Sequence, residues 1–299
     1  MLCQDRVVIV TGAGRGIGRA HALAFADAGA RVVVNDVGVA LDGSQTGEGP
    51  AKQVVTEIER RGGKAVANTD DVADFEGAGR LIQAAVDEFG RLDVLVNNAG
   101  FVRDRMLINL SEQEWDAVIR VHLKGHFATL QQAARYWRER SKAGEQPQAR
   151  VINTSSGAGL LGSVGQGNYS AAKAGIAGLT LVAAAELGRY GVTVNAIAPA
   201  AHTRMTEDVF AADMASPDSG FDAMAPENIS PLAVWLGSTE SADVTGRVFE
   251  VEGGKVTLAT AWRHGPSTDK GARWDPAELG DVVANLIEQA PEPEPVYGA

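Results

Sequence analysis

The sequence predicts an α/β protein of one domain, built on a doubly wound parallel sheet of about seven strands with helices on both faces. Three observations favour this fold. Short runs of β-branched residues alternate with longer segments of helical periodicity, as in parallel strands joined by crossover helices. Several of these runs end in glycine, aspartate or asparagine, as at Gly12, Asp36 and Asn98. A chain of 299 residues is also long enough to bury a large core.

The amino-acid composition argues against some classes of binding partner. The formal charge of −11 argues against nucleic acid and against an anionic membrane surface as the main partner. Cys3 is the single cysteine, so no internal disulfide can form. No apolar run approaches the ~18 residues of a membrane span, and the N-terminus enters a strand without a signal-peptide pattern. We therefore expect a cytoplasmic protein. Any phosphate-bearing ligand would have to bind through backbone amides or a small basic cluster.

The first strand–turn–helix unit contains a candidate phosphate site. Residues 7–10 are a β-branched run, residues 11–18 read Thr-Gly-Ala-Gly-Arg-Gly-Ile-Gly, and residues 19–28 have helical periodicity. Glycines allow a tight turn, so the free N–H groups of the helix N-terminus can approach a pyrophosphate. The same glycines would also serve a purely structural turn, and that alternative stays open.

The second strand, residues 31–35, ends at Asp36. A carboxylate at the end of this strand can accept hydrogen bonds from both hydroxyls of an adenosine ribose, and it repels a 2′-phosphate. Asp36 therefore favours NAD over NADP. A plain role as a turn residue at the strand end remains the alternative.

The other elements follow the same alternation. We expect further strands at residues 64–72, 92–96, 151–154, 191–199 and 246–254, and helices at 51–61, 74–89, 111–140, 168–190, 226–236 and 276–289. The long segment 38–50 is a glycine-rich loop. Residues 1–254 form the predicted domain, residues 255–290 extend it, and the Pro/acidic tail 291–299 is expected to be disordered.

Tyr169 and Lys173 are the candidate catalytic pair. Four residues apart on a helix, they share one face, and a fixed ammonium would lower the pKa of the phenol. Tyr169 then becomes a plausible general acid or base. Ser156 lies 13 residues upstream (169 − 156 = 13), just after a predicted strand, where it can hydrogen-bond a carbonyl oxygen that Tyr169 also reaches. An ordinary surface tyrosine and lysine are the alternative for the pair alone.

In this order and spacing, Ser156, Tyr169 and Lys173 resemble the catalytic residues of the short-chain dehydrogenase/reductase family, whose fold is a Rossmann-type sheet. The resemblance covers residues ~6–254 and includes the glycine turn and Asn97-Asn98-Ala99-Gly100. It implies an NAD-dependent enzyme in which Ser156 orients the substrate oxygen, Tyr169 moves the proton and Lys173 holds the nicotinamide ribose. It implies cofactor contacts from Gly12, Arg15, Gly16, Ile17, Gly18, Asp36, Asp71, Val72, Asn98, Ala99, Gly100, Tyr169, Lys173, Pro199 and Thr203.

Three positions bear on how closely the chain follows the family. His122 stands where the family usually has an asparagine of the proton relay, and it is either a substitute relay member or a histidine packed between helices. Ala200 replaces the usual glycine after Pro199. Arg15 occupies a position where a basic residue sometimes meets a 2′-phosphate, but Val37 rather than a second cation follows Asp36.

Several segments are similar to the (3R)-hydroxyacyl-CoA dehydrogenase region of peroxisomal multifunctional enzyme type 2 and its bacterial single-domain relatives. They include Val121-His-Leu-Lys-Gly125, Gly165-Gln-Gly-Asn-Tyr169 and Ala198-Pro-Ala-Ala-His-Thr-Arg-Met205. The implied reaction is oxidation of a (3R)-3-hydroxyacyl-CoA thioester to the 3-ketoacyl thioester. A hydroxysteroid or other secondary alcohol is the alternative substrate, because fold does not fix substrate. A catalytically idle NAD-binding sensor or scaffold is the alternative outside enzymes.

Two segments carry expectations beyond the chemistry. Small residues recur at helical spacing in 168–190, and in the resembled family this helix pairs subunits, so we expect a homodimer or homotetramer. Residues 202–224 mix apolar and polar side chains without a strand pattern. We expect a substrate lid there, with an apolar packing helix as the alternative.

Overall fold

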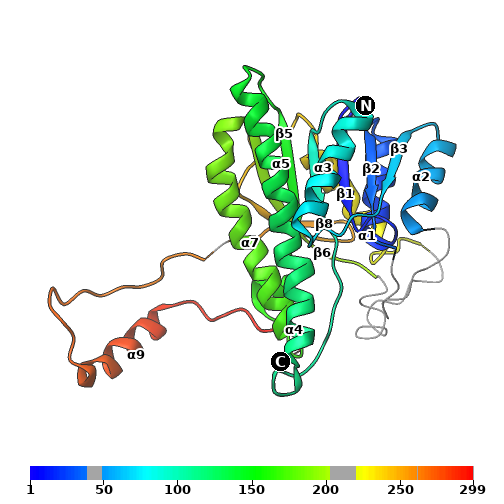
Figure 1. The fold of residues 1–299 in the computed structure, drawn as a ribbon. Coiled ribbons are helices and arrows are strands. Elements are labelled where there is room, and N and C mark those ends of the chain that lie inside the picture. The colour runs from blue at the N-terminus through cyan, green and yellow to red at the C-terminus, as the bar shows by residue number, and fades with distance from the viewer. Residues whose placement is uncertain (39–48, 203–219, 261, 299) are drawn as a thin grey trace.

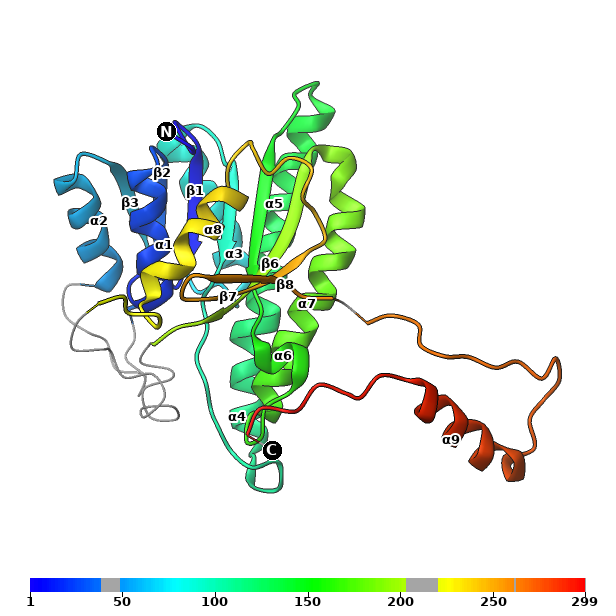
Figure 2. The ribbon, with the colours of Figure 1, turned by 180° about the vertical axis from the view of Figure 1, so that it is seen from behind.

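The computed structural model describes residues 1–38, 49–202, 220–260 and 262–298. Within them one sheet has the strand order β3-β2-β1-β4-β5-β6-β7-β8 (Figures 1 and 2). Its strands are β1 Val7–Thr11, β2 Arg31–Asn35, β3 Lys64–Asn68, β4 Val94–Asn97, β5 Ala149–Thr154, β6 Val192–Ala200, β7 Val248–Glu252 and β8 Lys255–Leu258. The first seven pair in parallel, which confirms the predicted doubly wound α/β fold.

An eighth strand adds to the seven that the sequence predicts. Gly253, at φ +54°, lies in a tight turn after β7, and β8 returns antiparallel with Glu252 opposite Lys255. A positive φ at this position suits glycine because a side chain would be strained there. The first residues of the C-terminal extension thus form the strand at this edge of the sheet, next to β7.

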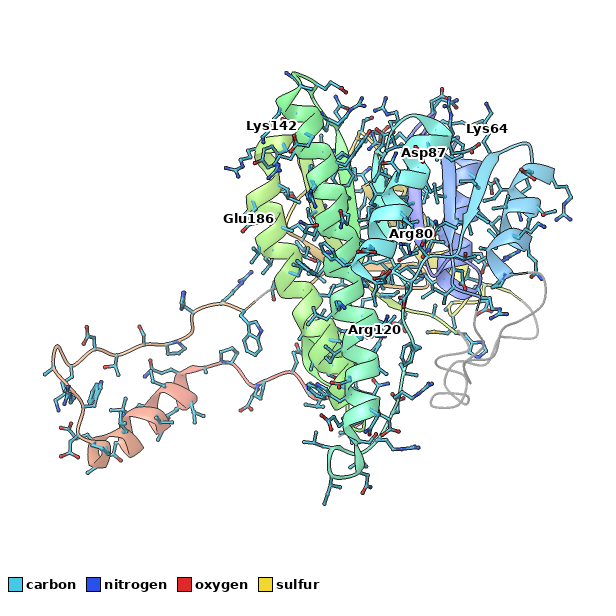
Figure 3. All side chains as sticks on the ribbon, in the orientation of Figure 1. Lys64, Arg80, Asp87, Arg120, Lys142 and Glu186 are labelled. Carbon is cyan, nitrogen blue, oxygen red and sulfur yellow. The ribbon has the colours of Figure 1, made fainter. Side chains whose placement is uncertain are left out.

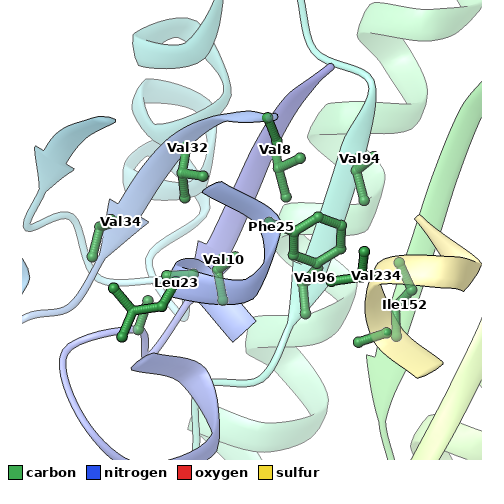
Figure 4. Close-up of a cluster of buried hydrophobic side chains, with 14 of the residues drawn as sticks. Val8, Val10, Leu23, Phe25, Val32, Val34, Val94, Val96, Ile152 and Val234 are labelled. Atoms are coloured by element: carbon green, nitrogen blue, oxygen red, sulfur yellow. The ribbon is translucent and has the colours of Figure 1, made fainter. Parts of the chain in front are cut away.

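Helices cover both faces of the sheet. Their bounds are α1 Gly16–Asp27, α2 Pro50–Arg60, α3 Phe75–Phe89, α4 Glu112–Ile119, α5 Gly125–Lys142, α6 Gly157–Leu161, α7 Gly167–Leu187, α8 Ser230–Leu236 and α9 Leu279–Gln289. The helices α1, α2 and α8 contribute to one buried cluster and α3, α5 and α7 to the other. Figure 4 shows Phe25 of α1 and Val234 of α8 over the first face.

Alternating strand residues supply the two clusters. In β1, Val8 and Val10 pack toward α1, whereas Val7 and Ile9 pack toward α3. All four are fully buried, because helices cover both sides of a parallel strand. The β-branched runs of the sequence are therefore continuous, without the polar alternation of a one-sided sheet. Charged side chains such as Lys142 and Glu186 lie on the outer helix surfaces (Figure 3).

The helix predicted over 111–140 is present, and the structure adds a π-helical turn in its middle. The capping box of Ser111 and Glu114 starts α4 as expected. A π-helical turn, Arg120–Lys124, then separates α4 from α5. Such a turn inserts an extra residue into the helical register and is frequent at functional sites. It carries His122, whose ring is directed at the backbone of Phe101.

The third strand is shorter than expected, and the C-terminal extension returns to the domain. β3 ends at Asn68, and residues 70–73 turn toward α3, where Asp74 caps the helix by accepting a hydrogen bond from the Gly77 amide. The extension carries α9 away from the main body and then returns to it (Figures 1 and 2). Disorder of the tail 291–299 stays a prediction; in this structure the Val164 amide donates to the Tyr297 carbonyl at 2.9 Å.

The apolar helix α7 belongs to the fold of this domain. With the 3₁₀ turn Gly188–Tyr190 it is long and apolar enough, by length and composition alone, to cross a membrane. Its inner face accounts for part of that composition: Ile176, Ala183 and Ala184 are buried, and 33% of the apolar window is buried in this structure. Most of the expected lid 202–224, Thr203 within it, and most of the loop 38–50 lie outside the described residues.

Candidate active site

The glycine turn after β1 forms a cradle at the carboxyl edge of the sheet. Gly12 and Gly16 have φ of +61° and +52°, where glycine is favoured. A Cβ on Gly18 would lie 2.2 Å from the Gly12 carbonyl oxygen, so the turn closes only without side chains. Because α1 begins at Gly16 and has no side-chain cap, the amides of its first turn lie at this glycine turn, and free amides at a helix N-terminus can bind a pyrophosphate. These residues fit a dinucleotide.

Asp36 is held against this cradle. Its carboxylate accepts hydrogen bonds from the Gly14 amide at 3.0 Å and the Gly38 amide at 2.8 Å. The side chain is half-buried, and a Cβ on Gly14 would lie 2.7 Å from its Oδ2 atom. Arg15 caps α1 with extended backbone beside it. The structure therefore places a fixed negative charge where the sequence expects the adenosine ribose.

Thr11 links the two turns that the cofactor would touch, and sequence reasoning did not single it out. Its hydroxyl accepts the amides of Asn98 at 2.9 Å and Ala99 at 3.1 Å. The Asn98 side chain donates to the Thr11 carbonyl at 3.0 Å. A Cβ on Gly12 would meet Ala99 Cα at 2.7 Å. In the sequence, the only feature that could have pointed to Thr11 was a hydroxyl residue at the end of the first predicted strand.

Asp71 and Val72 lie at the same edge of the sheet and contact other residues of the chain. Asp71 accepts the Ala73 amide at 2.8 Å and pairs with Arg120 at 2.6 Å. Val72 is buried, and its Cγ2 atom would lie 3.0 Å from a Cβ on Gly125. The contact of these two residues with an adenine stays a prediction.

The structure brings Ser156, Tyr169 and Lys173 together. Ser156 follows β5 and caps α6, where its hydroxyl accepts the Ala158 amide at 3.2 Å. Tyr169 and Lys173 project from the first turns of α7, and the Tyr169 hydroxyl is hydrogen-bonded to the Ser156 side chain. The Lys173 ammonium lies 5.4 Å from the Tyr169 ring centroid and donates to the Thr154 carbonyl at 2.7 Å.

Burial reverses the expected effect of Lys173 on Tyr169. Desolvation raises the pKa of the Tyr169 phenol to about 12, and the hydrogen bond from Ser156 opposes this only in part. Desolvation also lowers the pKa of Lys173 to about 7, because the side chain is 2% exposed. At neutral pH the lysine is therefore only partly charged, and the chain alone keeps Tyr169 protonated.

His122 lies between the glycine-rich turn after β4 and Tyr169. Its Nε2 atom is 2.6 Å from the Phe101 carbonyl oxygen and 3.0 Å from the Phe101 amide. Its ring meets the Tyr169 ring edge-on at 5.3 Å, and a Cβ on Gly100 would overlap it at 2.0 Å. Burial holds the pKa of His122 well below its usual range, so the ring is neutral. Its buried Nδ1 atom makes no hydrogen bond with the described residues.

A buried polar network beneath the catalytic residues also escaped sequence reasoning. Asn97 Nδ2 donates to Asn153 Oδ1 at 3.1 Å, and Asn153 Nδ2 donates to the Thr180 hydroxyl at 2.9 Å. The Thr129 hydroxyl donates to Asn97 Oδ1 at 2.7 Å. His126 Nε2 accepts the Thr154 amide at 3.3 Å. These bonds tie α5, β4, β5 and α7 together and so hold the catalytic residues in register.

Pro199 lies in β6 opposite Val251, at the same edge of the sheet as the catalytic residues. Ala200 ends the strand, and the following turn reaches His202, whose amide donates to the Met224 carbonyl at 2.7 Å. No group of three or more His, Cys, Asp or Glu side chains in the described chain is placed to hold a metal ion.

Comparisons with known proteins show the family to which the chain belongs. Residues 6–213 match the short chain dehydrogenase family. The chain is 48% identical to the hydroxyacyl-CoA dehydrogenase ChsB1 of Mycobacterium tuberculosis, over 99% of this chain and 92% of that one. It is 47% identical to mouse peroxisomal multifunctional enzyme type 2, over 85% of this chain and 32% of that protein. A crystal structure of a short chain dehydrogenase from Mycobacterium avium superposes with TM-score 0.92 at 68% identity, with both chains fully covered. The chain therefore belongs to the short-chain dehydrogenase family of oxidoreductases.

Proposed function

We propose that the protein oxidises a (3R)-3-hydroxyacyl-CoA thioester to the 3-ketoacyl thioester with NAD. The observation that carries the proposal is the Ser156–Tyr169–Lys173 cluster at the carboxyl end of β5 and the start of α7. The names of the relatives support the acyl-CoA substrate, since one is a hydroxyacyl-CoA dehydrogenase. The family itself uses a nicotinamide cofactor, and Asp36 supports NAD.

The residues of this chain divide the chemistry between them. Bound NAD would supply the hydride acceptor and a positive charge, held by the glycine turn, Asp36 and Lys173. Ser156 and Tyr169 share a hydrogen bond, so a substrate oxygen can replace or extend that contact and be fixed beside both hydroxyls. Tyr169 takes the hydroxyl proton as the carbon loses hydride. Because burial keeps Tyr169 protonated in the chain alone, the phenol must first lose its own proton, and the positive charges of protonated Lys173 and of bound NAD would favour the phenolate during turnover.

His122 is the proposed relay member. A neutral imidazole both donates and accepts, and Nδ1 has hydrogen-bonding capacity that the described residues do not use. Two observations support this proposal: the His122 ring meets the Tyr169 ring edge-on at 5.3 Å, and His122 lies in a π-helical turn. A proton leaving Tyr169 would then pass the His122 ring instead of the asparagine usual in the family.

Initial rates on a substrate panel test the proposal. The panel contains 3-hydroxyacyl-CoA thioesters of both configurations and a hydroxysteroid, each with NAD and with NADP. We expect NADH formation from the (3R) thioesters, with the (3S) thioesters inert. Turnover confined to the hydroxysteroid would replace the substrate and keep the enzyme class. No turnover on any member would favour the sensor reading.

Asp36 should decide the choice of cofactor. Replacing Asp36 with serine removes the negative charge while leaving a hydroxyl that the Gly14 and Gly38 amides can still approach. We expect the preference for NAD over NADP, measured as the ratio of kcat/KM values, to fall by about 10- to 100-fold, since one close like-charge repulsion is worth about 1–3 kcal/mol. Asp116→Ser, at an exposed position of α4, is the matched control. An unchanged ratio in Asp36→Ser would contradict the assignment.

A homodimer or homotetramer is the proposed assembly. The outer face of α7 exposes Leu181 and Val182, and the neighbouring α5 exposes Phe127, which stacks on Phe75 at 6.2 Å. Large apolar side chains gathered on neighbouring helices favour association. Two such faces packed together would bury α7 and explain its high hydropathy.

A further inference from the structure

The end of the chain pairs with a loop beside the catalytic serine. The Tyr297 amide donates to the Gly162 carbonyl at 3.2 Å, and the Val164 amide donates to the Tyr297 carbonyl at 2.9 Å. These two bonds form a short parallel bridge between Ser163 and Tyr297. The contact spans more than a hundred residues of sequence, so it fixes the tail at one place on the domain.

The Tyr297 ring lies on Gly157, the residue after Ser156. A Cβ on Gly157 would lie 2.9 Å from the Tyr297 hydroxyl oxygen and 3.0 Å from its Cε2 atom. Burial, with Glu250 and Glu252 of β7 next in effect, raises the pKa of the Tyr297 phenol. The ring therefore stays neutral and lies between the Ser156 turn and the end of β7.

Apolar side chains continue outward from Tyr297. The Arg105 amide donates to the Gly165 carbonyl at 2.8 Å, which joins loop 105–108 to loop 162–166. Leu107 Cδ1 would lie 3.4 Å from a Cβ on Gly167. We name the exposed apolar residues of these three segments the entrance patch: Met106, Leu107, Ile108, Val164, Val296 and Tyr297. Ile108 is 91% exposed and Leu107 is 74% exposed, which is unusual for neighbouring large apolar residues.

We propose that the entrance patch binds the apolar acyl group of the substrate, and that Tyr297 of the C-terminal segment is a specificity-determining residue. The proposal rests on the proposed function and names which part of the substrate this surface takes. In the proposed function the reacting carbon lies at Ser156 and Tyr169, and Gly157, which follows Ser156, contacts the Tyr297 ring, so a substrate group extending past Gly157 would meet that ring. The patch begins at Tyr297, its six members are apolar, and charged side chains such as Arg105 and Glu294 lie at its border.

Tyr297→Ala tests the proposal, with Tyr297→Phe as the matched variant. The substrates are 3-hydroxybutyryl-CoA, 3-hydroxyhexadecanoyl-CoA and a 3-hydroxyacyl-CoA that carries a fused-ring group. We expect Tyr297→Ala to lower kcat/KM for the long or fused-ring thioester by about tenfold, through KM, because an aromatic contact is lost. The short thioester and the KM for NAD should not change. Tyr297→Phe keeps the ring and should behave as the parent chain on all three.

Comparison of the two large substrates shows which apolar group fits. A loss confined to the straight chain assigns the patch to a linear acyl group, and a loss confined to the fused rings assigns it to a polycyclic one. Equal losses on all three substrates, or none, would overturn the proposal. A Tyr297→Phe loss as large as that of Tyr297→Ala would also overturn it, because the hydroxyl rather than the apolar ring would then matter.

A double-mutant cycle with Gly157→Ala adds an independent measurement. The added methyl group would displace the Tyr297 ring, so Gly157→Ala alone should reproduce the chain-length effect of Tyr297→Ala. In the Tyr297→Ala background it should add little, since the two residues act through one contact. Additive losses would contradict the contact. If Tyr169→Phe abolishes turnover while Tyr297→Ala leaves chain-length preference intact, the proposed function stands and this inference fails.

Discussion

Replacement of Tyr169 by phenylalanine is expected to lower kcat/KM for alcohol oxidation by about 10²- to 10⁴-fold, the range attributed to a positioned general acid or base. The substitution removes one oxygen and keeps the ring that meets His122 edge-on at 5.3 Å. The Ser156 side chain loses its hydrogen bond to the phenol but keeps that from the Ala158 amide. The fold should therefore survive, and the loss should fall on proton transfer.

Two measurements make this result interpretable. Binding of NADH, followed by its fluorescence, should be unchanged in Tyr169→Phe, because the glycine turn and Asp36 are untouched. Tyr190→Phe, in the 3₁₀ turn after α7, is the matched control and should keep full activity. If NADH production from hydroxyacyl-CoA proceeds at the parent rate in Tyr169→Phe, the proposed enzymatic role of Tyr169 is wrong. The alternative of an NAD-binding sensor or scaffold then gains support.

Acidification from pH 6.5 to pH 4 should cost the fold about 7 kcal/mol through two buried histidines, as each lost pH unit costs about 1.4 kcal/mol per ring. Burial lowers the pKa of His21 to about 4 and, together with the charge of Lys173, that of His126 to about 3. His21 contacts the Ser230 hydroxyl at 2.9 Å and is fully buried. Total domain stabilities are about 5–15 kcal/mol, so acid unfolding near the lower pH follows.

The direction follows from proton uptake. Above pH 6.5 both rings are neutral in the folded and the unfolded chain, and neither affects the pH dependence. Below pH 6.5 the unfolded chain binds a proton at each histidine, whereas the folded chain does not until the lower pKa is reached. The unfolded state is therefore favoured progressively as the pH falls, and the stability lost is recovered on neutralisation.

Urea unfolding at pH 7, 6 and 5 checks this expectation. The double variant His21→Gln, His126→Gln should be less stable at pH 7 but should lose less stability between pH 7 and pH 5 than the parent chain. His264→Gln, at an exposed position, is the control and should retain the parent slope. Parallel slopes for the parent and the double variant would show that other groups, chiefly carboxylates, dominate acid unfolding.

Local patterns in the sequence sufficed for the parts of the site that depend on neighbouring residues. The glycine turn, Asp36 at the end of β2 and the four-residue spacing of Tyr169 and Lys173 are all properties of single segments. The parallel arrangement then places the ends of β1, β2, β4 and β5 at one edge of the sheet. Strand periodicity predicts that edge because buried parallel strands read as continuous apolar runs.

Long-range contacts were beyond such patterns. The π-helical turn at His122 and the Thr129–Asn97–Asn153–Thr180 network join residues from different segments, and no local spacing encodes them. The same holds for the bridge between Tyr297 and the loop before α7. The extra residue in the helix at His122 and the contact of the tail both depend on which side chains and backbone groups of distant segments lie against them.

By itself the sequence determined the parallel sheet, the glycine turn after β1 and the candidate catalytic residues, because these follow from periodicity, glycine geometry and short spacings. Only the tertiary structure decided the protonation states of Tyr169 and Lys173. The sequence predicted that Lys173 would lower the pKa of Tyr169, whereas burial raises it to about 12 and lowers that of Lys173 to about 7. Desolvation depends on every element packed around a group, and it exists only once the chain has folded.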